Sequence, residues 1–159
     1  MPEETLIFIR HDFVDISNII LTELDARLKP SIERVETVLI PSVPREIFEK
    51  HYSMHKEKDF YEWIMNFSVG NPVVLAIYRG EDAIQRVIQI AGPTDPSNAP
   101  LTTIRGFYSR DSLEQSRQEK RMCRNVLHRS DSIESYLRER KVWQEYLTQK
   151  LILQENIKP

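Results

Sequence analysis

RNVLHRSDSIES, from Arg124 to Ser135, is the most informative segment of the chain. It opens with a short apolar step, from Asn125 to His128, and a polar turn follows. The next residues recur at helical spacing and predict one long final helix: Ile133, Tyr136, Leu137, Arg140, Trp143 and Leu147. Asp131 and Glu134 are spaced as a capping pair at the start of that helix. We therefore expect His128 at the end of a short buried strand, just before the helix.

The polar residues after His128 predict a partner for its ring. Ser132, Ser135 and Glu139 are three and four residues apart, so they line one stripe of the final helix. A carboxylate that holds one ring nitrogen fixes the tautomer and leaves the other nitrogen free as a nucleophile. We expect Glu139 to orient His128 in this way. Taken alone, however, a histidine near a serine and a glutamate is more often structural than catalytic.

Working outward, the chain alternates short apolar runs with helical patterns. Strands are predicted at residues 5–9, 34–40 and 72–78, because each run is short and rich in strand formers. Helices are predicted at residues 16–28, 45–52, 57–69 and 83–91. This order favours an α/β fold of the α+β kind: a ferredoxin-like sandwich in which helices cover a mainly antiparallel sheet of about four strands.

Size and composition indicate one globular domain. The chain has 159 residues, of which 40% are hydrophobic and 29% charged. We place a domain at residues 1–150 and a peripheral tail at 151–159. The net charge of −2 gives no general attraction to nucleic acid or to an anionic membrane, so neither is expected as a partner. No apolar run approaches the roughly 20 residues of a membrane-spanning helix.

Cysteine usage and the first residues favour a reducing compartment. Cys123 is the only cysteine, which excludes an intrachain disulfide and a thiolate metal site. Glu3 and Glu4 precede a short apolar run, unlike a basic secretion leader. We expect a soluble, cytoplasmic protein.

The remaining motifs carry weaker signals. Residues 92–100 contain three prolines and a glycine, and residues 109–124 are strongly charged, so both are predicted as loops. Neither GxxxxGK[ST] nor GxGxxG occurs, which argues against a Walker-type phosphate loop and a dinucleotide fold. His51 and His55 are four residues apart, as metal ligands can be, but no third ligand accompanies them. Histidines on the surface are the favoured interpretation of this pair.

The run around His128 closely resembles the NxxHxSDSxES signature of nucleoside diphosphate kinases. The matching residues are Asn125, His128, Ser130, Asp131, Ser132, Glu134 and Ser135. Further similarities follow in the correct order along the chain: TLIFIRHDFV beside the family's TLxxIKPDxV, then HY at 51 and 52, PVV at 72–74, AGPTDP at 91–96 and TIRG at 103–106. The resemblance covers nearly the whole chain, with the charged loop before Asn125 looking like an insertion.

This resemblance implies a phosphotransferase with a phosphohistidine intermediate. His128 would take the terminal phosphate of a nucleoside triphosphate and pass it to a diphosphate, with Mg²⁺ as cofactor and with Glu139 and Ser130 positioning the ring. Phe60 would stack on the base, without reading its edge, and Asn125 would hold the sugar. The residues expected to hold phosphates are Arg10, Tyr52, Lys58, Thr94 and Arg105. Family members also assemble, so a homo-oligomer is expected.

The chain departs from the family pattern at several positions. Arg10 stands for a lysine and Lys58 for an arginine, so charge is kept there. Ile88 replaces a phosphate-binding arginine, and Arg129 replaces a small residue after the histidine. We therefore expect slow turnover, because loss of one such donor typically slows phosphoryl transfer roughly 100-fold to 1000-fold. The alternative is an impaired homologue that binds nucleotide or a protein without efficient turnover, and an interaction module without a nucleotide role is more distant.

Overall fold

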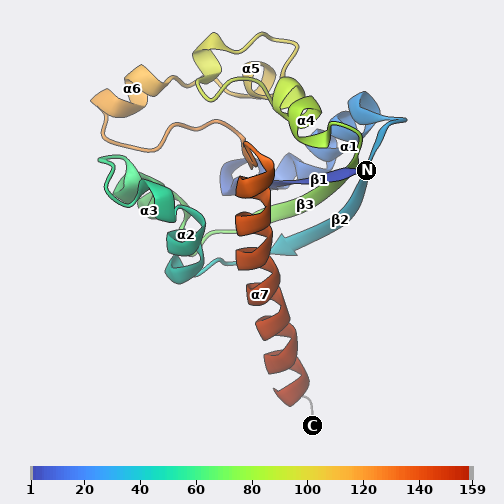
Figure 1. Cartoon of the computed structure of the whole chain (residues 1–159). Coiled ribbons are helices and arrows are strands. Elements are labelled where there is room, and N and C mark those ends of the chain that lie inside the picture. The colour runs from blue at the N-terminus through green and yellow to red at the C-terminus, as the bar shows by residue number, and fades with distance from the viewer. Residues whose placement is uncertain (1, 158–159) are drawn as a thin grey trace.

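The computed structural model describes residues 2–157 and contains a single four-stranded sheet in the order β2-β3-β1-β4 (Figure 1). The strands are β1 Glu3–Ile9, β2 Ile32–Ile40, β3 Val73–Gly80 and β4 Leu127–Arg129. All neighbouring strands pair antiparallel. The predicted α+β sandwich is therefore confirmed.

Helices cover both faces of this sheet. They are α1 Ser17–Leu28, α2 Arg45–His51, α3 Tyr61–Ser68, α4 Ala83–Ala91, α5 Ile104–Tyr108, α6 Leu113–Gln118 and α7 Ile133–Ile157. Short 3-10 turns lie at His11–Ile16, Ser53–His55 and Pro96–Asn98. In the part of the chain that is described, no helix is long and apolar enough to span a membrane.

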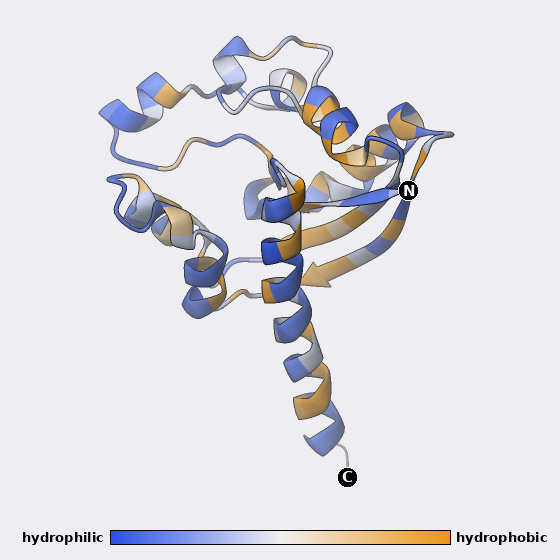
Figure 2. Cartoon of the chain, viewed as in Figure 1, coloured by the Kyte–Doolittle hydropathy of each residue, from blue (hydrophilic) through white to orange (hydrophobic). Residues whose placement is uncertain are grey.

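The pleat of the central strands creates two cores. Leu6 and Phe8 of β1 face α2, α3 and α7, whereas Ile7 and Ile9 face α1 and α4, because successive side chains point to opposite faces of a sheet. Strand β3 alternates in the same way. Figure 2 shows the resulting apolar strands enclosed by helices whose outward residues are hydrophilic. Phe8 of β1 lies in the core against which α7 packs, and this places Phe8 beside the candidate site.

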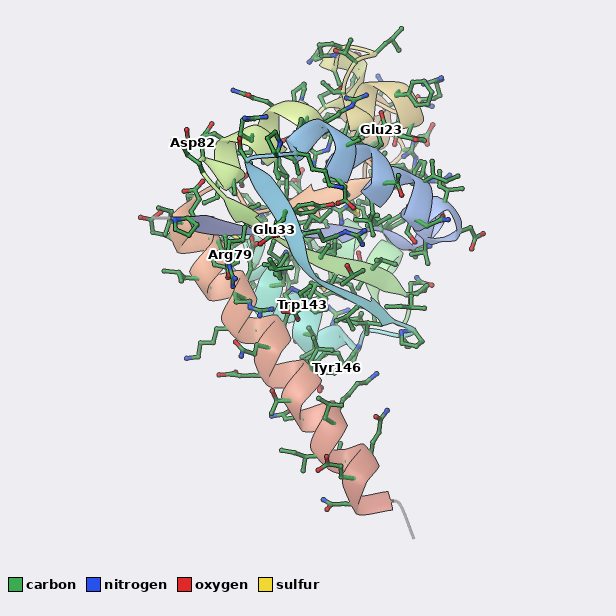
Figure 3. All side chains as sticks on the ribbon, turned by 90° about the vertical axis from the view of Figure 1, so that its right-hand side faces the viewer. Glu23, Glu33, Arg79, Asp82, Trp143 and Tyr146 are labelled. Carbon is green, nitrogen blue, oxygen red and sulfur yellow. The ribbon has the colours of Figure 1, made fainter. Side chains whose placement is uncertain are left out.

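Helix α7 differs from its prediction at both ends. Ser132 caps it, since the Ser135 amide donates to Ser132 Oγ at 3.1 Å and the Tyr136 amide to the Ser132 carbonyl at 2.9 Å. The predicted capping pair of Asp131 and Glu134 is therefore wrong. The helix also continues into the segment expected as a tail and projects beyond the body, while Trp143 and Tyr146 face the sheet (Figures 1 and 3).

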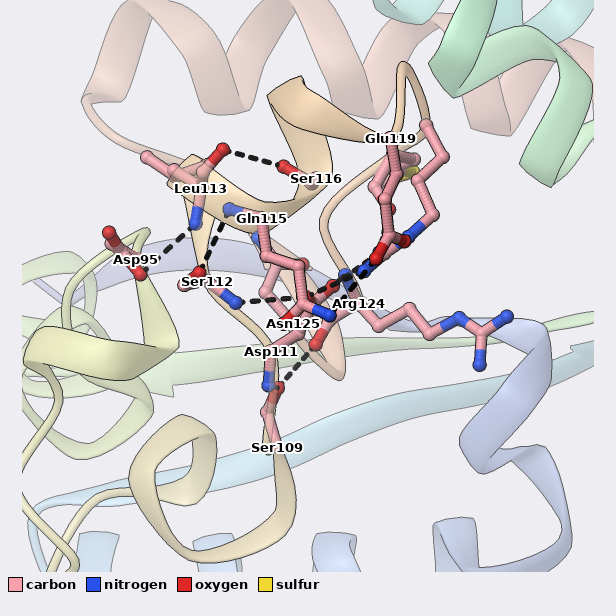
Figure 4. Close-up of polar contacts among 12 residues, drawn as sticks. Asp95, Ser109, Asp111, Ser112, Leu113, Gln115, Ser116, Glu119, Arg124 and Asn125 are labelled. Carbon is pink, nitrogen blue, oxygen red and sulfur yellow. Dashed lines mark hydrogen bonds and ion pairs between the residues drawn. The ribbon is translucent and has the colours of Figure 1, made fainter.

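The charged segment 109–124 is more ordered than a loop prediction implies, because it contains α6 and a polar network (Figure 4). Asp111 accepts hydrogen bonds from both Nη atoms of Arg121, at 2.7 and 3.0 Å, and from the Arg124 amide at 2.8 Å. The Arg121 guanidinium lowers the pKa of Asp111 to about 2. The α6 amide of Leu113 donates to Asp95 Oδ1 at 3.3 Å, which joins this segment to the loop after α4.

Candidate active site

A cavity of about 470 Å³ opens where α3, segment 109–124, β4 and the start of α7 meet. One group of lining residues is apolar and comes from the α2–α3 region and from segment 109–124: Met54, Phe60, Trp63, Ile64, Leu113 and Met122. A polar group comes from the ends of β1 and β4, from the loops beside them and from α5, and it includes Arg10, Thr94, Arg105, Asn125, His128 and Arg129. A cavity with both kinds of lining suits a ligand that has an aromatic part and an anionic part.

His128 enters this cavity from the short strand β4. It pairs with Phe8 of β1, and the two rings stack with centroids 4.9 Å apart. Its Nε2 is buried and has no hydrogen-bond partner among the described residues. Its Nδ1 also makes no hydrogen bond to the described residues, but this atom is not fully buried. Burial and then the nearby Arg10 hold the pKa of His128 well below its usual value. Near neutral pH the ring is therefore uncharged and can present Nδ1 as a nucleophile.

Glu139 lies behind the His128 ring, as the sequence predicts. Its Oε2 is 3.1 Å from His128 Nε2, although the direction of this contact does not meet hydrogen-bond geometry. Ser130 Oγ donates to the same oxygen at 2.6 Å. Burial raises the pKa of Glu139, while His51 and the Ser130 hydroxyl act in the opposite direction. Ser130 is itself buried outside the cavity lining, so it can act on His128 only through Glu139.

His51 is buried beside His128, which makes its interpretation as a surface histidine wrong. The His51 and His128 ring centroids are 4.4 Å apart, and the rings meet edge to face. Trp143 Nε1 donates to His51 Nδ1 at 3.1 Å. Because Nδ1 accepts this bond, the neutral ring carries its proton on Nε2. Burial and then His128 keep the pKa of His51 well below its usual value, so this neutral form persists near pH 7.

His51, His128 and Glu139 are also the candidate metal ligands of the described chain, in place of the pair His51 and His55. Each offers one ligand atom, and these atoms lie within 4.8 Å of one another. A metal on His51 Nε2 would need that nitrogen unprotonated, however, and the Trp143 indole N–H already occupies Nδ1. The indole therefore opposes metal binding and favours a role for His51 as a hydrogen-bond donor.

A strained turn precedes His128. Val126 has φ of 76°, and the Leu127 amide donates to the Asn125 carbonyl at 2.9 Å, which forms a γ-turn with a left-handed centre. Arg105 holds the carbonyls on both sides: Nε donates to Asn125 O at 3.2 Å and Nη2 to Leu127 O at 2.8 Å. Its Nη1 donates to Gly92 O at 3.0 Å. Arg105 thus has a structural function that the sequence did not reveal.

Arg105 remains a cation at neutral pH despite its burial. Desolvation lowers its pKa to about 9, and repulsion from Arg129 contributes. Arg105 also lines the cavity, and a guanidinium has five N–H donors, so it can bind a ligand while keeping its three bonds to carbonyls.

Arg10 connects three of the residues that the sequence singled out. Its Nε donates to Asn125 Oδ1 at 3.0 Å and its Nη1 to the Tyr52 hydroxyl at 3.0 Å. Asn125 in turn donates to the Thr94 carbonyl at 3.4 Å, a long contact. All four of these residues line the cavity. Arg10 is therefore held in place before any ligand binds.

Besides Ser130, two predicted or suspected positions lie outside the cavity. Lys58 is exposed and does not line it, and α4, which carries Ile88, contributes no lining residue. Arg129 does line it; its side chain is 10% exposed, pairs with Asp131 and has a buried Nε without a partner among the described residues. Sequence reasoning missed the lining residues Met54, Trp63, Leu113, Arg117 and Met122. Trp63 carried a signal, since its helical spacing indicated an apolar face, but spacing does not separate a core from a cavity wall.

Comparisons with known proteins agree with this geometry. The family model described as nucleoside diphosphate kinase matches residues 3–147. The nucleoside diphosphate kinase of Hyperthermus butylicus is 38% identical over 144 residues, which cover 90% of this chain and 93% of that protein. The solved enzyme of Halobacterium salinarum, in complex with CDP, is 26% identical and has a TM-score of 0.73, with 89% of this chain and 87% of that chain covered.

A solved nucleoside diphosphate kinase of Borrelia burgdorferi, with bound vanadate and ADP, shares the fold with a TM-score of 0.81. It is 24% identical, and the alignment covers 89% of this chain and 86% of that one. The family model covers most of the chain, and the relative from Hyperthermus butylicus is 38% identical over 90% of it. This chain belongs to the nucleoside diphosphate kinase family.

Proposed function

We propose that the chain transfers the terminal phosphate of a nucleoside triphosphate to a nucleoside diphosphate through a phosphate on His128 Nδ1. The Nδ1 lone pair attacks the γ-phosphorus, and the bond from phosphorus to the bridging oxygen breaks, so the first diphosphate leaves with that electron pair. A terminal oxygen of a second diphosphate then attacks the same phosphorus, the bond from phosphorus to Nδ1 breaks, and its electron pair returns to Nδ1, which restores the neutral ring. One observation carries this proposal: the uncharged His128 ring has one nitrogen buried beside Glu139 and the other open to a cavity that arginines line.

The lining residues divide the work of holding the nucleotide. Arg10 and Arg105 supply fixed positive charge toward the phosphoryl group, which is the main contribution a protein makes to such a transfer. Phe60 and its apolar neighbours accept the base by stacking, so purines and pyrimidines should both be used. Asn125 and Thr94 are available to the sugar and the phosphates.

Magnesium enters with the substrate in this proposal. The metal-ligand group of the described chain is rich in imidazole, whereas Mg²⁺ prefers an octahedral set of oxygens. Asp111 is saturated by Arg121 and by main-chain amides, so it is a poor ligand. The phosphate oxygens are thus the expected ligands, and the ion neutralises charge on the nucleotide.

The exposed edge of the sheet supports self-assembly, and the single cysteine, Cys123, favours the cytoplasm as the compartment. Strand β2 pairs only with β3 among the described strands, and it carries the exposed apolar side chains Val35 and Leu39. An unpaired edge with apolar residues favours contact with another chain, and a second copy is the expected partner. A monomeric mass by light scattering at micromolar concentration would contradict this assembly.

Incubation with ATP labelled at the γ-phosphate tests the reaction itself. We expect acid-labile label on the parent protein and none on His128→Ala, with the label released by addition of a diphosphate. His55→Ala is the control, because His55 lines the same cavity outside the group around His128. Nucleotide binding by the parent without label would instead indicate an impaired homologue. If His128→Ala still binds nucleotide and still acquires label, the assignment of the nucleophile is wrong.

A further inference from the structure

The charged segment 109–124 forms part of the cavity wall. It contributes Leu113, Ser116, Arg117, Arg121, Met122 and Cys123 to the lining. This contribution goes beyond the expected role of a solvated loop, because the Asp111 network holds the segment in a defined conformation (Figure 4). The segment can therefore present a side chain to a ligand at a fixed place.

Most of the arginines around the cavity already have partners. Arg10 binds Asn125 and Tyr52, and Arg105 binds three main-chain carbonyls. Arg121 is neutralised by Asp111 at 2.7 Å and by Glu119 at 2.5 Å, and Arg129 pairs with Asp131.

Arg117 is different. It lines the cavity, its side chain is exposed, and no hydrogen bond or ion pair joins its guanidinium to any residue in the described range 2–157. The guanidinium is thus an unpaired positive charge with all its donors available.

The fold joins the start of α6, the helix that carries Arg117, to the polar side of the cavity. Leu113, at the start of α6, is tied by its amide to Asp95, the residue after Thr94. Arg117 is four residues after Leu113, so both lie on the same face of α6 and both line the cavity. Thr94 is also joined to Asn125 and through it to Arg10. Arg117 therefore projects from an element that begins beside the candidate phosphate-binding residues.

We propose that Arg117 binds the polyphosphate of the nucleotide and supplies the positive charge that α4, with Ile88, does not bring to the cavity. The inference rests on the proposed function, since it assigns one further substrate contact to the same site. An arginine suits this task because its planar donors match phosphate oxygens and its charge is permanent. The charged segment is then a phosphate-binding element of the enzyme.

Binding measurements on Arg117→Met test this proposal, because methionine keeps an unbranched chain and removes the charge. We expect ATP affinity to fall about 10-fold, as is typical for loss of a hydrogen bond to a charged group, while adenosine affinity stays within about 2-fold. Arg117→Lys should fall between the two, and the salt dependence of ATP binding should become shallower in Arg117→Met. Lys120→Met is the matched control, since Lys120 is an exposed cation of the same segment outside the lining.

The outcomes separate this inference from the proposed function. If Arg117→Met and Lys120→Met bind ATP equally well, or if Arg117→Met weakens adenosine as much as ATP, the assignment of Arg117 is overturned while His128 labelling stands. If the parent neither binds ATP nor acquires label, both proposals fail. Circular dichroism and a melting curve confirm that each variant is folded, which is expected because the Arg117 side chain is exposed.

Discussion

Two adjacent stretches of the chain line the cavity and are held in place by opposite means. Residues 125–130 carry His128 and are fixed by buried hydrogen bonds. The Arg105 guanidinium and the Arg10 amide donate to carbonyls of the strained turn, and the Ser130 hydroxyl donates to Glu139. Residues 109–124 are held mainly by the ion pairs of Arg121 with the largely buried Asp111 and the exposed Glu119, and they carry Arg117, whose side chain has no partner among the described residues.

The two stretches give the site one rigidly held part and one part whose side chain can adjust. A nucleophile must be held in one geometry, and buried hydrogen bonds to main chain provide that. A cation that follows a polyphosphate benefits from freedom to adjust, and an exposed arginine on a short helix provides that. Variants of the two stretches should therefore affect different properties, and four of them are ordered here by the size of the expected effect.

Arg105→Met should have the largest effect, because it leaves three main-chain carbonyls without their donor next to a strained turn. We expect the free energy of unfolding to fall by about 3 kcal/mol, with loss of labelling at His128. Urea denaturation measures the first and autophosphorylation the second. Arg124→Met is the control, since the Arg124 side chain is exposed and points away from the network (Figure 4). Equal stability of the two variants would show that the turn does not depend on Arg105.

Asp111→Asn should destabilise the protein by about 2 kcal/mol near neutral pH, since the pKa of Asp111 is lowered from 3.8 to about 2. A depressed carboxyl pKa gives stability that is complete above about pH 4 and is lost as pH falls toward 2. The difference between parent and variant should therefore shrink over that range. Urea midpoints at several pH values test it, with Glu119→Gln as a nearly neutral control. A difference that stays constant down to pH 2.5 would contradict the ion-pair explanation.

Trp143→Phe should act on rate more than on affinity. It removes the donor that fixes the His51 tautomer beside His128. We expect phosphorylation of His128 to slow about 10-fold while ATP affinity stays within about 2-fold. The control is Tyr146→Phe, which alters a neighbouring buried aromatic of α7 that contacts the Ser42 carbonyl instead. A similar rate loss in both variants would indicate general loosening of α7.

Ile88→Arg should have the smallest effect in the parent protein. Since α4 does not line the cavity and Arg117 already brings charge there, we expect a rate change within about 3-fold. In the Arg117→Met background the same change should likewise leave ATP affinity nearly unchanged, because α4 lies outside the cavity lining. Slow turnover of the parent, expected from Ile88 alone, stays a prediction until kcat is measured. Strong activation by Ile88→Arg alone would show that Arg117 does not serve as its substitute.

The sheet could be predicted because local composition and tertiary structure agree there. The apolar runs that became β1 and β3 are short, rich in strand formers and bounded by breakers, and both faces are buried as such runs require. Helix α6 was not predicted, because it depends on hydrogen bonds to Asp111 and Asp95. The donors of these bonds are distant in the chain or lie in polar surroundings. No local pattern encodes that network.

The site was predictable from its motif, and its supporting contacts were not. The sequence around and after His128 predicted roles for Glu139 and Ser130. Glu139 lies beside the His128 ring, and Ser130 donates to Glu139. The contribution of His51 could not be read from sequence, since its partner Trp143 is 92 residues away and the pair meets only when α2 packs on α7. The turn at Val126 was equally hidden, because valine rarely adopts a positive φ and no propensity predicts it.

The placement of the tryptophans makes the protein its own fluorescent reporter. The chain has two of them: Trp63 lines the apolar wall of the cavity, and Trp143 is fully buried and donates to His51, the neighbour of His128. Light emitted by Trp63 should respond to the arrival of a base, whereas emission from Trp143, in contact with His51, should respond to charge on the phosphorylated ring. Replacing either tryptophan by phenylalanine leaves a single emitter, so that nucleotide binding and phosphate transfer become separately visible in one stopped-flow instrument without any added dye.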